Sequence, residues 1–137
     1  MLIELTDIRK AFNQRKPNEF WAIQGVSLTI EANKITCLKG ASGSGKTTLL
    51  SMIGCLSRPT SGRITLDGKM VSGLPERFLT EIRRHTFGFI FQKFNLIQGM
   101  SVLENVMLPA YPLGLDHGTL KASAERLLQQ FQLGSTR

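Results

Sequence analysis

Residues 40–48 form a glycine-rich run, Gly-Ala-Ser-Gly-Ser-Gly-Lys-Thr-Thr, which restricts the fold more than any other part of the chain. The run matches the pattern G-x-x-x-x-G-K-[ST], which binds phosphate where a strand precedes it and a helix follows it. Glycines allow the backbone to approach a ligand with φ above zero, so that successive N–H groups can surround an anion. Lys46 supplies a compact positive charge, and Thr47 supplies a hydroxyl for a Mg²⁺ ion. The run therefore predicts a polyphosphate site.

Both flanks of the loop have the patterns that such a site needs. Residues 35–38, Ile-Thr-Cys-Leu, are β-prone and predict a buried strand before the loop. An apolar stripe follows the loop at Leu49, Leu50 and Ile53, and it predicts a helix that begins near Lys46. The phosphates would then lie at a helix N-terminus, where free N–H groups and the helix dipole favour anions.

Two other interpretations of the loop are weaker. A glycine-rich loop that only turns the chain would not explain why the strand, loop and helix patterns agree. A dinucleotide fingerprint, G-x-G-x-x-G, could begin at Gly43 and Gly45, but its last position is occupied by Thr48. The Lys46–Thr47 pair would also have no role in that fingerprint. Phosphate is therefore the favoured ligand.

Composition and charge indicate a globular chain. With 137 residues, 42% hydrophobic and 20% charged, the chain is long enough for one domain with its own core. No apolar run approaches the roughly 18 residues that span a bilayer, and no secretion signal is predicted at the N-terminus. The net charge of +7 is expected to reflect a solvated basic surface and the binding of a polyanionic nucleotide, rather than the binding of nucleic acid.

The cysteines and histidines do not predict a metal site. Cys37 and Cys55 have apolar neighbours and no C-x-x-C spacing, so we expect two reduced, buried thiols. His85 and His117 are far apart and lack ligand spacing, and they are expected to be surface or packing residues.

Strands and short helices are predicted on both sides of the loop up to residue 93. Strands are expected where apolar residues alternate or cluster, and turns where polar residues and glycine gather. The first predicted strand begins with the alternation at residues 3–8 and leads to Phe12, and the others lie at residues 21–30, 63–66 and 87–91. A helix is expected after Pro75. The first two strands would be joined by the polar loop 13–19 and form an antiparallel β layer.

The chain beyond residue 93 has a helical character. Ser101 and Glu104 form a capping-box pattern, and the helix that they begin should end by Pro109. A second helix is predicted from apolar residues at Leu120, Ala124, Leu127, Leu128 and Phe131. We therefore expect residues 1–93 to hold the β layer and phosphate-loop core, and residues 94–137 to begin an incomplete helical subdomain.

The order of further motifs resembles the ATP-binding subunit of an ABC transporter over essentially the whole chain. Four pieces carry the resemblance: Phe12 after the first strand, the Walker A loop at Gly40 to Thr48, the P-x-S-G-x-I-x-L-D-G segment at 59–68, and the strand into the Q-loop at 89–92. Residues 53–56, 83–92, 95–96 and 101–109 are also similar to the lipoprotein-releasing and macrolide-export subgroup. The resemblance implies an α/β fold with a P-loop NTPase core, an N-terminal antiparallel β layer and the start of a helical subdomain, truncated.

The resemblance also implies a site for ATP and Mg²⁺. Lys46 and Gln92 would be catalytic, and Thr47 and Gln92 would be the metal ligands. Phe12 would stack on adenine, whereas Phe20 and Trp21, which enter a strand, are alternatives more typical of core residues. The implied nucleotide-binding residues are Phe12, Gly40, Ala41, Ser42, Gly43, Ser44, Gly45, Lys46, Thr47 and Thr48.

A role in transport follows from the same resemblance. An intact member couples ATP binding and hydrolysis to transport, here with export expected, through a transmembrane permease and a second ATP-binding subunit. It would be cytoplasmic, peripheral on the inner face of the membrane, with no nucleic-acid partner. A soluble ABC ATPase that acts on DNA or in translation is less favoured, because residues 94–113 resemble the helical region that docks on the transporter.

The motifs that complete the family's catalytic site are missing from these 137 residues. They contain no L-S-G-G-Q signature, no Walker B strand ending in Asp-Glu and no switch histidine. We therefore expect this chain alone to bind ATP without turnover. The alternative is a truncated binding or regulatory module that never hydrolyses ATP.

Overall fold

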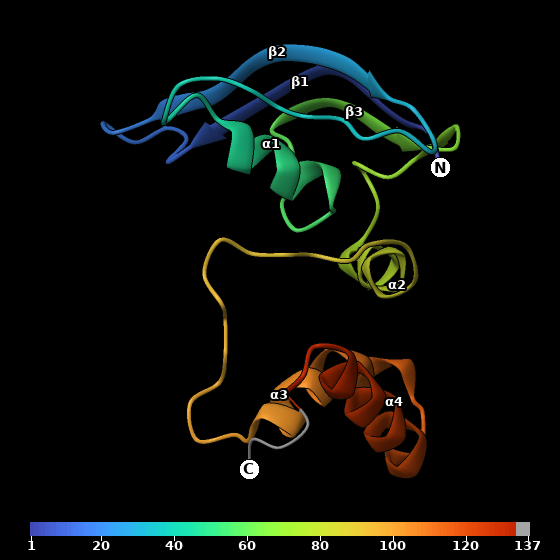
Figure 1. Cartoon of the computed structure of the whole chain (residues 1–137). Coiled ribbons are helices and arrows are strands. Elements are labelled where there is room, and N and C mark those ends of the chain that lie inside the picture. The colour runs from blue at the N-terminus through green and yellow to red at the C-terminus, as the bar shows by residue number, and fades with distance from the viewer. Residues whose placement is uncertain (134–137) are drawn as a thin grey trace. The chain divides into compact units, whose positions relative to one another are not determined.

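A computed structural model describes residues 1–133, which fall into two compact units, Met1–Phe87 and a second one from Gly88 onward. The first unit contains β1 (Ile3–Phe12), β2 (Phe20–Ile30), α1 (Lys46–Ile53), β3 (Ser61–Leu66), β4 (Lys69–Met70) and α2 (Glu76–Thr86) (Figure 1). The second contains α3 (Val102–Met107), the 3-10 helix η1 (Leu108–Leu113) and α4 (His117–Gln130).

The first unit is built on an antiparallel sheet with the strand order β2-β1-β3-β4. β1 lies between β2 and β3, since Ile3 pairs with Ile30 on one side and with Leu66 on the other. At the far end of β1, Phe12 pairs with Phe20 across the loop that joins the two strands. The predicted antiparallel β layer and its polar connecting loop are confirmed.

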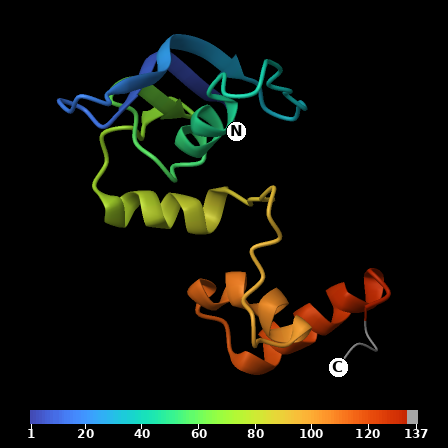
Figure 2. The same cartoon turned by 90° about the vertical axis from the view of Figure 1, so that its left-hand side faces the viewer.

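The core of the first unit lies between the sheet and two helices. α1 and α2 lie on the same side of the sheet in both views, with α1 the nearer to the strands (Figures 1 and 2). Apolar side chains of the strands meet those of the helices in one buried cluster, which includes Ile8, Ile64, Leu49, Met52 and Leu79. Burying one large aliphatic side chain is worth about 1.5–3 kcal/mol, so this cluster fixes α1 against the sheet.

The two extended segments that were predicted as strands at residues 35–38 and 87–91 do not form strands, so both predictions are wrong. Ile35 is 101% exposed and Ile90 is 104% exposed, which also contradicts the predicted burial of the first segment. A strand persists only when a neighbour accepts and donates its backbone hydrogen bonds. In the described part of the chain the four-stranded sheet supplies no such neighbour to either segment.

The second unit confirms the predicted helices with one adjustment. Ser101 Oγ accepts a hydrogen bond from Glu104 N at 3.2 Å, and a Glu104 carboxylate oxygen accepts one from Ser101 N at 2.7 Å, which is the expected capping box. α3 ends at Met107, before Pro109, and the chain continues as a 3-10 helix. In α4 the buried stripe is narrower than predicted, because Leu127 is exposed and Phe131, which is exposed too, follows the end of the helix.

The two cysteines differ in environment. Cys55 is buried, as expected, but Cys37 is exposed, so the prediction of two buried thiols is wrong for Cys37. Cys37 lies in the segment that does not form a strand, and it therefore has no sheet neighbour to cover it. Among the described residues no helix has the length and apolar character needed to cross a membrane.

Candidate nucleotide-binding site

The glycine-rich loop ends at Gly45, which is the N-cap of α1 and has a φ of 86°. A Cβ at this position would lie 2.6 Å from the Ala22 carbonyl oxygen and 2.6 Å from Ile23 Cδ1, both in β2. Contacts this short do not occur between real Cβ atoms and backbone, and the positive φ adds strain for any other residue. Glycine is therefore the residue that lets the start of α1 pack directly on β2.

The N-terminus of α1 provides backbone donors. The first helical hydrogen bond runs from Leu49 N to Gly45 O at 2.8 Å, so the N–H groups of residues 45–48 precede it. In the described chain no side chain caps this end, and no acidic residue lies in its first turn. The donors and the positive end of the helix dipole are thus available to an anion.

Lys46 holds the loop in a curl. Its ammonium group donates to Gly40 O at 2.9 Å, to Ala41 O at 2.6 Å and to Ser44 Oγ at 3.2 Å. An ammonium has three N–H donors, so all three are directed at the loop. A backbone hydrogen bond from Ser44 N to Ala41 O at 3.3 Å closes the same turn. The positive charge therefore lies among residues 40–48, which were predicted to bind phosphate.

The remaining loop residues are open to solvent or nearly so. Ala41, Ser42, Gly43 and Thr47 are exposed, and Thr48 is half-buried. The structure thus brings the predicted residues 40–48 together in one site. The exposed Thr47 hydroxyl in the first turn of α1 fits Mg²⁺ bound to a nucleotide, because this ion takes oxygen ligands and keeps several waters.

Phe12 is part of an aromatic pair. Its ring stacks on Phe20, with a centroid distance of 5.4 Å and an interplanar angle of 20°. The Lys10 ammonium lies 5.3 Å from the centroid of the Phe12 ring. Phe20 and Trp21 are exposed, so the prediction that they are core residues is wrong. The strand pairing of Phe12 with Phe20 produces this contact, which sequence spacing alone did not reveal.

Gln92 belongs to the second unit. It is exposed and follows Phe91 in a segment without helix or strand. Just before it, the rings of Phe89 and Phe91 stack at 5.8 Å with an interplanar angle of 16°. The structure therefore places a surface amide at this position rather than a residue at the end of a strand.

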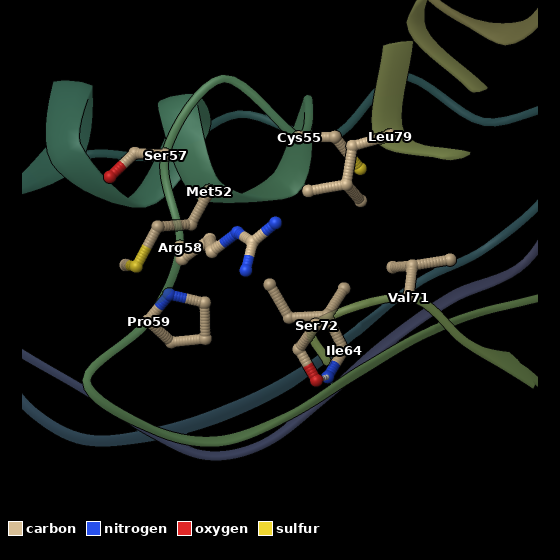
Figure 3. Close-up of a pocket in the computed structure, with 9 residues that line it drawn as sticks. All are labelled: Met52, Cys55, Ser57, Arg58, Pro59, Ile64, Val71, Ser72 and Leu79. Atoms are coloured by element: carbon tan, nitrogen blue, oxygen red, sulfur yellow. Dashed lines mark hydrogen bonds between the residues drawn. The ribbon is translucent and has the colours of Figure 1, made fainter. Parts of the chain in front are cut away.

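A small hollow in the first unit lies apart from the loop residues. It is bounded by the end of α1, the segment after it, the sheet and α2 (Figure 3). Its lining residues are Met52, Cys55, Ser57, Arg58, Pro59, Ile64, Val71, Ser72 and Leu79. Because most of these belong to the buried core or border it, the hollow is a gap in the core packing, and it includes none of residues 40–48.

Comparison with known proteins agrees with this geometry. Residues 23–137 match the sequence profile of the ABC transporter family. The macrolide export ATP-binding/permease protein MacB of Hyphomonas neptunium is 44% identical over 133 residues, which are 97% of this chain and 20% of that protein. The pyoverdine export ATP-binding/permease protein PvdT of Pseudomonas fluorescens is 42% identical over 134 residues, which are 98% of this chain and 20% of that protein. The chain spans about a fifth of the length of these relatives.

Solved structures show the same fold. The ATP-binding cassette MJ0796, in a dimeric post-hydrolysis state bound to ADP and Pi, superposes with a TM-score of 0.83 at 34% identity, over 93% of this chain and 56% of that one. The expected fold class, a P-loop core with an N-terminal antiparallel β layer and the start of a helical part, is thereby confirmed. With the profile match over most of the chain, the glycine-rich loop at the start of α1 and the shared cassette fold, this chain belongs to the ABC transporter family.

Proposed function

We propose that residues 40–48 bind the polyphosphate of ATP together with Mg²⁺. One observation carries the proposal: the Lys46 ammonium and the free N–H groups at the start of α1 belong to the same curled loop. Hydrogen bonds to a charged group contribute about 1.5–3 kcal/mol each, so several donors in one loop favour a ligand with several phosphate oxygens. A single carboxylate could not use that many donors.

Each predicted site residue has a role in this proposal. Lys46 neutralises charge on the terminal phosphates, and the Thr47 hydroxyl would hold Mg²⁺. Gln92 is proposed as the second metal ligand and as the amide that orients the attacking water, because an amide both donates and accepts hydrogen bonds. Phe12 would stack on adenine, an interaction worth about 1–3 kcal/mol for bases on aromatic side chains.

For the intact protein we propose coupling of ATP hydrolysis to export. Support comes from the relatives, which are export proteins with ATP-binding and permease parts, and from the dimeric state of the similar cassette. The intact protein would pair with a second ATP-binding part and act through a permease. It would lie at the inner face of the membrane.

For the 137 residues alone we propose binding without turnover. Lys46, Thr47 and Gln92 are present, whereas the sequence contains no Walker B strand ending in Asp-Glu and no L-S-G-G-Q motif. A steady-state ATPase assay, with Lys46→Ala as the control, tests this. Turnover by the parent chain that disappears in Lys46→Ala would contradict the proposal.

The length of the bound phosphate chain provides the test of the site itself. Calorimetric titration with ATP, ADP and AMP in the presence of Mg²⁺ should give affinities that fall in that order. Each lost phosphate removes charge and acceptors that the loop can use. Equal affinity for ATP and AMP would show that the loop does not bind the phosphates.

A further inference from the structure

We propose that Phe20 forms the second half of a two-ring platform for the nucleobase, so that base affinity depends on Phe20 as well as on Phe12. This inference rests on the proposed binding of ATP at residues 40–48. It assigns a base-stacking role, beside Phe12, to a residue that the sequence left as an alternative more typical of the core.

The two rings act as one surface because the strands hold them together. Phe12 is the last residue of β1 and Phe20 the first of β2, and they are direct partners in the ladder. Their stacked rings are 5.4 Å apart at 20°, within the range of favourable aromatic pairs. A base that stacks on one ring therefore meets a pair whose orientation is already set by the backbone.

The open ring surface lies mainly on Phe20. Phe20 is 54% exposed, whereas Phe12 is 36% exposed, since Phe12 is covered by Phe20 and by the Lys10 ammonium. That ammonium is held in place by a hydrogen bond to Arg58 O at 2.6 Å. Lys10 thus occupies ring surface on Phe12 and leaves the larger exposed area on its partner.

The platform is close to the phosphate loop. Phe20 precedes Ala22 by two residues, and the Ala22 carbonyl lies against Gly45 at the start of α1. Two residues of a strand span about 7 Å. A ligand with its phosphates at residues 40–48 would therefore reach the platform with its base.

Three variants of the full 137-residue chain test the platform: Phe20→Leu, Phe12→Leu and the matched control Trp21→Leu. Trp21 is also exposed, at 42%, and neighbours Phe20, but it makes no ring contact among the described residues. Each variant is titrated calorimetrically with Mg-ATP and with Mg-tripolyphosphate, which lacks a base. Thermal unfolding of each variant accompanies the titrations.

Phe20→Leu and Phe12→Leu should each weaken ATP binding by about fivefold to tenfold, because a stacking surface for the base is removed. Tripolyphosphate affinity should stay within about twofold of the parent chain, and Trp21→Leu should change neither affinity. ATP affinity unchanged in Phe20→Leu would overturn the inference, as would an equal loss for both ligands or an equal loss in Trp21→Leu.

The two proposals fail in different ways. If the parent chain binds tripolyphosphate but both phenylalanine variants keep full ATP affinity, the phosphate site stands and the platform is wrong. If the parent chain binds neither ligand, the proposed function itself is wrong, and the platform falls with it.

Discussion

The Lys46 ammonium nitrogen lies 2.6 Å from the carbonyl oxygen of Ala41, a shorter separation than from either of its other two loop partners. This contact ties the first helical residue of α1 back to the start of the glycine-rich loop. One side chain therefore supplies the positive charge of the site and also maintains the curl that exposes the backbone donors.

Removal of this charge should abolish most nucleotide affinity. Lys46→Ala loses both the attraction to phosphate and the three loop hydrogen bonds, and we expect Mg-ATP to bind at least about 100-fold more weakly, or about 3 kcal/mol. Lys39→Ala is the matched control, because Lys39 is exposed and adjoins the same loop. Titration calorimetry measures both. Equal losses in the two variants would indicate a general effect of net charge.

The close contact of Gly45 with β2 predicts a difference between two glycine variants. Gly45→Ala must relieve a clash with the Ala22 carbonyl oxygen, whereas a Cβ at Gly43 would meet nothing within 4 Å. Both glycines have a positive φ, 86° at Gly45 and 77° at Gly43, so the strain of that conformation is similar in the two variants. We expect Gly43→Ala to destabilise the first unit by about 1 kcal/mol and Gly45→Ala by about 1–3 kcal/mol more.

Urea unfolding followed by Trp21 fluorescence measures these free energies, since the tryptophan lies in β2 next to the contact. Similar unfolding free energies for the two variants would show that α1 does not begin against β2.

The capping box predicts a local effect in the second unit. Ser101→Ala removes the oxygen that accepts from Glu104 N, and the loss of such an N-cap costs about 1 kcal/mol. Ser123→Ala, at an exposed position of α4, is the control. Amide exchange of residues 102–107 should speed up in the first variant alone. Unchanged protection would mean that packing of Met107, not the cap, maintains α3.

The same box makes α3 sensitive to acid. Hydrogen bonds from the backbone and side chain of Ser101 lower the pKa of Glu104 below its usual value. A carboxylate with a lowered pKa in the folded state stabilises the fold above its unfolded pKa of about 4.3, and this contribution is lost as the pH falls through the folded pKa. Asp116, the N-cap of α4, has a pKa lowered by Thr119 and follows the same direction.

Helical chemical shifts of residues 102–107 should therefore diminish as the pH falls below about 4. Glu104→Gln keeps an acceptor oxygen but does not titrate, and its α3 shifts should depend less on pH. An identical pH profile in the parent chain and in Glu104→Gln would place the acid sensitivity elsewhere.

The two thiols should react at very different rates. Burial raises the pKa of the Cys55 thiol, which lowers its thiolate fraction at neutral pH and shields it from reagents, whereas Cys37 is exposed. A disulfide reagent such as dithiobisnitrobenzoate should label one thiol quickly and the other only on unfolding. Cys37→Ser should remove the fast phase. A fast phase that survives in this variant would show that Cys55 is accessible.

Local patterns in the sequence were sufficient for much of the fold and for the phosphate loop. The loop needs particular residue types at adjacent positions, so Gly45, Lys46 and Thr47 are recognisable without a structure. The same holds for the capping box of Ser101 and Glu104, whose two hydrogen bonds are formed within three residues. Alternating apolar residues in β1 and β2 predicted the hairpin because its strands are neighbours along the chain.

Strands whose partners must come from elsewhere could not be decided in this way. Residues 35–38 and 87–91 have the composition of strands, but composition does not supply the neighbour that their backbone groups require, and they do not form strands.

Side-chain surroundings were likewise decided by the tertiary structure. Sequence position favoured Phe12 as the ring that stacks on the base, and it left Phe20 as an alternative more typical of the core. The pairing of β1 with β2 instead stacks the two rings and leaves Phe20 the more exposed. The sequence by itself determined which groups can bind phosphate, because that chemistry is local. Only the tertiary structure decided which aromatic ring neighbours them, since cross-strand contacts depend on register rather than on residue type.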